Sequence, residues 1–97
     1  MDKNEAYQEK TEAQLKLIRT KIEELKAKAQ KAKAEAKIDY MEGVEALEKK
    51  RDDVEAKLKE AKKAGEQAGR DLKQGIETSL FDLKKAVDSA FERFKQE

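Results

Sequence analysis

The chain has 97 residues and a nearly balanced charge, since 23 Lys and Arg offset 22 Asp and Glu to leave a net charge of +1. It contains no Cys and no His, which excludes disulfides, thiolate chemistry and the ordinary zinc, haem and iron–sulfur sites. The most common general base of enzymes is therefore missing too, and we expect no enzyme activity, no cofactor and no metal ion.

The composition favours helix along the whole chain. Ala, Glu, Lys, Leu and Arg make up 60 of the 97 residues, more than the roughly half that is typical of a long helix or coiled coil. Pro is absent and Gly occurs only 4 times, so few residues favour a turn. We predict an all-α fold in one helical coiled-coil module over residues 1–97, divided into a heptad part (7–36), a transition (37–54) and 11-residue repeats (55–97).

The heptad part carries apolar and small residues in alternating steps of four and three. These residues are Thr11, Leu15, Ile18, Ile22, Leu25, Ala29, Ala32 and Ala36. The spacing places them along one side of a helix and is typical of a coiled-coil seam. Beyond Ala36 the stripe continues with a longer period and one charged position, through Tyr40, Gly43, Leu47, Arg51, Val54 and Leu58.

Two charged segments each have a functional and a purely structural interpretation. Residues 26–37 carry five Lys and one Glu and could contact the phosphates of a nucleic acid. The segment lacks Arg and aromatic residues, so a solvated helix face is favoured and we do not expect a nucleic-acid partner.

Glu48, Asp52 and Glu55 share a helix face and could hold a hard cation. They alternate with Lys49, Lys50 and Arg51, which favours a charged surface instead.

Residues 55–97 form four copies of an 11-residue repeat, of which the last is one residue short. Each copy begins with Asp or Glu and has Lys at its eighth position, while positions four, seven and eleven are mostly apolar. Eleven residues over three turns keep these positions in line along a nearly straight helix. Because the repeat crosses Gly65–Gly69 in phase, we predict a continuous helix there, with a turn as the alternative. Of the three Phe residues near the C-terminus, we expect Phe91 and Phe94 to be core anchors and Phe81, on the polar side of the repeat, to be an exposed ring. Packing of Phe81 on a neighbouring chain or a third helix is the alternative.

An isolated helix would leave the apolar stripe in water, so another helix must cover it. The favoured architecture is an extended coiled coil, one long helix or a helical hairpin, that self-associates into a homo-oligomer with antiparallel helices. A three-helix bundle with turns near Gly43 and Gly65–Gly69 is the alternative. The expected helix-association interface consists of Leu15, Ile18, Ile22, Leu25, Leu47, Val54, Leu58, Leu72, Ile76, Leu80, Leu83, Val87, Phe91 and Phe94.

Three stretches carry a resemblance to known proteins: DKNEAYQEKTEAQL at 2–15, AKAEAKIDYMEGVEALEKKRDDVEAKLKEAKKA at 32–64 and DLKQGIETSLFDLKKAVDSAFERF at 71–94. Together they resemble a family of small bacterial coiled-coil proteins of unassigned function. The 11-residue repeats are also similar to group 3 late-embryogenesis-abundant proteins and, more loosely, to exchangeable apolipoproteins and synucleins. These resemblances imply stress protection or a lipid surface, and they carry no catalytic residues.

The leading hypothesis for function is therefore a non-catalytic coiled-coil self-association or scaffold protein, with a stress-related role implied by the resemblance. The first alternative is an amphipathic repeat protein that binds lipid or membrane surfaces. The second is a desiccation protectant that is largely unfolded in water. The N-terminal residues form no apolar signal segment, and no stretch approaches the roughly 18 apolar residues of a membrane span, so we expect a cytoplasmic location and no transmembrane segment.

Overall fold

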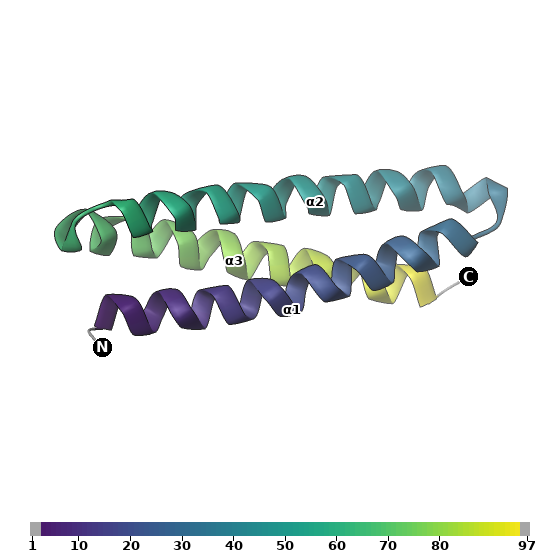
Figure 1. The fold of residues 1–97 in the computed structure, drawn as a ribbon. Coiled ribbons are helices and arrows are strands. Elements are labelled where there is room, and N and C mark those ends of the chain that lie inside the picture. Colours follow the sequence, from purple (N-terminus) through teal and green to yellow (C-terminus); the bar gives the residue numbers. More distant parts are fainter. Residues whose placement is uncertain (1–2, 96–97) are drawn as a thin grey trace.

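The computed structural model describes residues 3–95 and consists of three long helices, α1 (Lys3–Lys31), α2 (Ala34–Lys63) and α3 (Glu66–Lys95) (Figure 1). The helices form an up-down-up bundle with principal-axis extents of 49, 18 and 16 Å. α1 and α3 are therefore parallel, and α2 is antiparallel to both. The all-α prediction is confirmed, and the architecture is the three-helix alternative rather than one long helix or a hairpin.

The first turn lies at Ala32–Lys33, so the predicted turn near Gly43 is wrong: Gly43 is inside α2. Lys33 has an extended backbone (φ −61°, ψ 150°), and its carbonyl accepts hydrogen bonds from the backbone N–H of Ala36 and of Lys37, both at 2.9 Å. The N–H of Ala32 donates to the carbonyl of Ala29 at 3.2 Å. The last turn of α1 and the first turn of α2 are thus closed by backbone bonds, without Gly or Pro.

The second turn lies at Ala64–Gly65, so the predicted continuity of the helix through Gly65–Gly69 is wrong at its first residue. Ala64 is extended (φ −76°, ψ 155°), and its N–H donates to the carbonyl of Glu60 at 3.1 Å. The N–H of Gly69 donates to the carbonyl of Gly65 at 2.8 Å, which begins the hydrogen-bond ladder of α3. In the described part of the chain no residue has a positive φ, so neither turn requires glycine for conformational reasons.

The core contains most of the residues that the stripe predicts, and also Val44, which the stripe leaves out in favour of Gly43. The seam positions of α1 from Thr11 to Ala29 are all buried. Of the fourteen expected interface residues twelve are buried, and only Leu72 and Phe91 are half-buried. The helices that cover them belong to the same chain. The stripe therefore acts as an intramolecular core, and burying it does not require a second copy.

Aromatic rings close the core beside the first turn. The rings of Tyr40 in α2 and Phe94 in α3 stack with centroids 4.1 Å apart and planes inclined by 16°. The Tyr40 hydroxyl donates to the carbonyl of Arg93 at 3.4 Å. These contacts join the start of α2 to the end of α3 and thereby fix the register of the two helices.

Candidate functional site: the groove between α1 and α3

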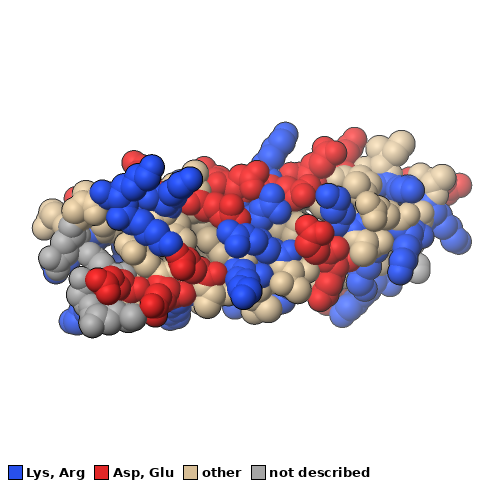
Figure 2. Space-filling view, in the orientation of Figure 1, with Lys and Arg blue, Asp and Glu red and all other residues tan. Residues whose placement is uncertain are grey.

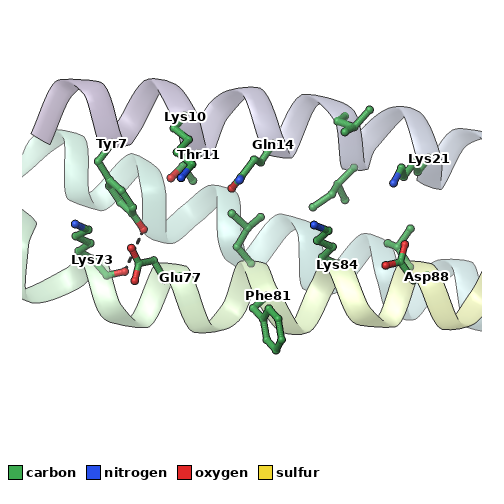
Figure 3. A pocket seen from close by; sticks show the side chains of 14 residues that line it. Tyr7, Lys10, Thr11, Gln14, Lys21, Lys73, Glu77, Phe81, Lys84 and Asp88 are labelled. Carbon is green, nitrogen blue, oxygen red and sulfur yellow. Dashed lines mark hydrogen bonds between the residues drawn. The ribbon is translucent and has the colours of Figure 1, made fainter. Parts of the chain in front are cut away.

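An open groove of about 450 Å³ runs between the parallel helices α1 and α3. Tyr7, Lys10, Gln14 and Lys21 project from α1, whereas Lys73, Glu77, Phe81, Lys84 and Asp88 project from α3 (Figure 3). Buried side chains of the core, including Ile18, Leu80 and Val87, form its floor. The groove thus combines an apolar floor with charged edges, as binding surfaces for helices or amphiphiles do.

A tyrosine closes one end of the groove. The Tyr7 hydroxyl donates to the carbonyl of Lys73 at 3.2 Å, and the Lys73 ammonium lies 4.8 Å from the centroid of the Tyr7 ring. Partial burial raises the pKa of Tyr7 above its ordinary value, and the charge of Glu77 acts in the same direction, while a hydrogen bond with Thr11 opposes them. Tyr7 therefore stays neutral at physiological pH and serves as a fixed contact between α1 and α3.

Two uncovered apolar side chains lie at this groove. Leu17 in α1 is 57% exposed and Phe81 in α3 is 59% exposed, and both line the groove. In residues 3–95 the only other large apolar side chain that is mostly exposed is Ile38, at the start of α2. A pair of exposed apolar residues beside an apolar floor is typical of an interaction surface.

The sequence pointed to only one of this pair. The 11-residue spacing places Phe81 on the polar side of the repeat and favours an exposed ring, and this prediction is confirmed because the side chain is 59% exposed. The sequence patterns do not identify Leu17, because the heptad spacing places Leu15 and Ile18 in the core and gives no role to the two residues between them. The signal that could have found Leu17 is its size, since a large apolar residue lies there on the polar face of an otherwise regular amphipathic helix.

Several charged side chains along the groove form no ion pair in the described part of the chain. Among the described residues, Glu77 and Asp88 on α3 form no ion pair, and the same holds for Lys10, Lys21 and Lys84. On the face of the bundle that Figure 2 shows, Lys, Arg, Asp and Glu are intermixed. The unpaired charges of the groove are therefore available to a partner.

The acidic residues considered as cation ligands are instead paired with cations. Glu55 accepts from Arg19 of α1 at 2.7 Å, and Asp52 accepts from Arg51 at 2.9 Å. Glu48 lies 3.8 Å from Lys26 of α1. Burial acts to lower the pKa of Arg51, but its hydrogen bond to Asp52 and the charges of the three carboxylates outweigh burial and raise the pKa above its ordinary value. In the described ranges no group of three or more Asp or Glu could hold a metal ion, so this cluster joins α1 to α2.

The lysine-rich segment 26–37 contains the first turn, so its lysines do not form one continuous helix face. Lys26 faces Glu48 of α2, and the Lys28 ammonium lies 5.9 Å from the centroid of the Phe91 ring of α3. At least two of its lysines therefore contact other helices of the same chain.

Across residues 3–95, no helix is long and apolar enough to cross a membrane. No family model, no curated protein and no solved structure matches the chain.

Proposed function

We propose that this chain is a non-catalytic helical module that assembles with a second copy of itself through the groove between α1 and α3. The observation that carries the proposal is the exposure of Leu17 and Phe81 at the edges of an apolar groove. The remaining large apolar side chains, apart from Ile38, are at least half covered by the chain's own helices in the described part of the structure. The sequence hypothesis of self-association is thus retained, but the contact surface moves from the apolar stripe to the groove.

The expected dimer is weak. The bundle is already folded around its own core, so association gains only the burial of the groove and of the two exposed side chains on each copy. An interface confined to one groove belongs to the small, transient class of interfaces, for which we expect a dissociation constant of about 1–100 µM. Such a constant allows the assembly to respond to the concentration of the protein, which suits a scaffold.

Binding to anionic lipid surfaces is the second candidate function. Lysines border Leu17 and Phe81 on both sides of the groove, with Lys10 and Lys21 on α1 and Lys84 on α3. Ammonium groups on both borders of an apolar strip suit a surface of anionic headgroups. Glu77 and Asp88 lie among them and would be repelled by the same surface, and for this reason self-association ranks first.

Sedimentation velocity over a concentration series tests the proposal. We expect the wild-type chain to change from monomer to dimer with rising concentration, and the Leu17→Asp/Phe81→Asp variant to remain monomeric with unchanged helicity. Ile38→Asp is the matched control, because Ile38 is 71% exposed and does not line the groove. A wild-type chain that is monomeric at about 500 µM contradicts self-association. If that monomer binds vesicles of anionic lipid, the second candidate replaces the first.

A further inference from the structure

We infer that the second copy docks through α3 in an antiparallel two-fold register centred between Leu80 and Phe81. In this register Lys73 lies opposite Asp88 of the second copy, and Glu77 lies opposite its Lys84. The inference rests on the proposed self-association and specifies its geometry. It is carried by the order of charges along one face of α3.

The charges on this face alternate about the apolar pair. Reading along α3, they are Lys73 and Glu77, then Leu80 and Phe81, then Lys84 and Asp88. In an antiparallel pair of identical helices related by a two-fold axis, residues that lie opposite each other have residue numbers with a constant sum. Lys73 with Asp88 and Glu77 with Lys84 both sum to 161, as does Leu80 with Phe81. A single axis therefore brings together two opposite-charge pairs, each formed twice, and the apolar centre.

These six residues also share one face in space. At about 100° per residue, they fall within an arc of about 100° around the helix. The structure agrees, because all six line the same groove. A helix of a second copy that lies against this face of α3 therefore contacts all six, with the Phe81 ring, which points away from α1, at the outer edge of the contact (Figure 3).

A parallel register gives the opposite result. Parallel pairing places each residue near its own copy, so that Lys73 meets Lys73 and Glu77 meets Glu77. Like charges at such positions repel each other. The charge order thus selects the antiparallel arrangement.

The lysines of α1 fit the same register. Tyr7 contacts Lys73, and Lys28 lies over Phe91, so Lys10 lies near the level of Lys73 and Lys21 nearer that of Lys84 and Asp88. The two-fold axis then brings Asp88 of the second copy near Lys10, and Glu77 of the second copy near Lys21. Each unpaired carboxylate of the groove thus receives cations from both helices of the other copy.

Charge reversal tests the register directly. Glu77→Lys and Lys84→Glu each place like charges at two symmetry-related pairs of the homodimer. We expect each variant alone to raise the dissociation constant at least about tenfold at low salt. In an equimolar mixture, both pairs of the heterodimer are again of opposite charge, and we expect its dissociation constant to return to within about threefold of the wild-type value.

Glu45→Lys and Lys49→Glu are the matched controls. They make the same charge changes at exposed positions of α2, which does not line the groove, and we expect wild-type dimerisation from both. Sedimentation of each variant and of the mixture gives the constants. If the wild-type chain dimerises but the reversals leave dimerisation unchanged, or the mixture fails to restore it, the register is wrong while self-association stands. If the wild-type chain does not dimerise, both proposals fail.

Discussion

The guanidinium of Arg93 occupies the space that a side chain at Gly43 would fill. A Cβ atom at Gly43 would lie 2.7 Å from Nη2 of Arg93, too close for the two to coexist unchanged. The same guanidinium lies 5.8 Å from the centroid of the Tyr40 ring and 5.7 Å from that of Phe94. The glycine inside α2 thus makes room for a cation of α3 rather than for a turn.

We predict that Gly43→Ala leaves the free energy of unfolding almost unchanged, because two effects cancel. The higher helix propensity of Ala stabilises the chain, and the displacement of Arg93 destabilises it. Ala in a helix interior stabilises by about 1 kcal/mol over Gly, and displacing Arg93 from the two rings costs about 0.5–1 kcal/mol. In the Arg93→Ala background the steric conflict is absent, so the same change should stabilise the chain by about 1 kcal/mol. Urea unfolding of the wild type, the two single variants and the double variant measures the coupling between Gly43 and Arg93. Equal effects of Gly43→Ala with and without Arg93 would contradict this coupling.

Leu83 is completely buried, and we predict that Leu83→Ala lowers the free energy of unfolding by about 2–5 kcal/mol. All three helices share one core, so they should unfold in a single transition whose midpoint moves to lower urea. Leu17→Ala is the control, because the same atoms are removed from a mostly exposed side chain and the expected cost is within about 0.5 kcal/mol. Similar effects of the two substitutions would contradict the core as described.

Helicity should be independent of protein concentration, because the apolar stripe is covered within one chain. We expect strong helical circular dichroism and a cooperative thermal transition at concentrations well below the dissociation constant of the proposed dimer. Helicity that falls on dilution would indicate that folding requires a second copy. A coil-like spectrum at every concentration would favour the desiccation protectant.

Tyr7 should ionise above the ordinary pKa of tyrosine, because burial and the charge of Glu77 both disfavour tyrosinate. Since the folded-state pKa is the higher one, the stability gained from neutral Tyr7 is complete below the unfolded-state pKa of about 10 and is lost as pH rises through the folded-state value. In a Tyr40→Phe background, Tyr7 is the only tyrosine, and ultraviolet absorbance follows its ionisation. Glu77→Gln should lower this pKa but leave it above the ordinary value, since burial is the larger cause. A Tyr7 pKa at the ordinary value in the parent chain would contradict the contact.

The sequence predicted the buried residues well, because helical periodicity reports directly which side of a helix avoids water. Ile22 and Leu25 follow the heptad spacing, Ile76 and Leu83 follow the 11-residue spacing, and all four are buried. Periodicity does not say whether the covering helix belongs to the same chain or to another. The stripe alone is therefore equally compatible with a self-associating rod, whereas in the structure the covering helices belong to the same chain.

The first turn could not be predicted from local signals. Ala32 and Lys33 both favour helix, and neither Gly nor Pro lies within several residues of them. The break divides the chain so that helices of 29, 30 and 30 residues pack along their full lengths. Tertiary packing therefore outweighs local propensity at this turn. The helix propensity of the turn residues that packing must overcome amounts to only about a few tenths of a kcal/mol per residue.

This turn also offers room for stabilisation. Lys33 is the N-cap of α2, and its ammonium carries only donors, so it cannot accept a hydrogen bond from the first N–H groups of the helix. We predict that Lys33→Asp supplies this acceptor, and a negative charge at the positive end of the helix, and raises the free energy of unfolding by about 1 kcal/mol. Lys31→Asp is the matched control: the same change two residues earlier places the carboxylate at the C-terminal end of α1, where the helix dipole disfavours it, and should destabilise. Thermal unfolding at low salt should therefore move in opposite directions for the two variants, and a shift in the same direction would show that net charge, rather than the cap, is responsible.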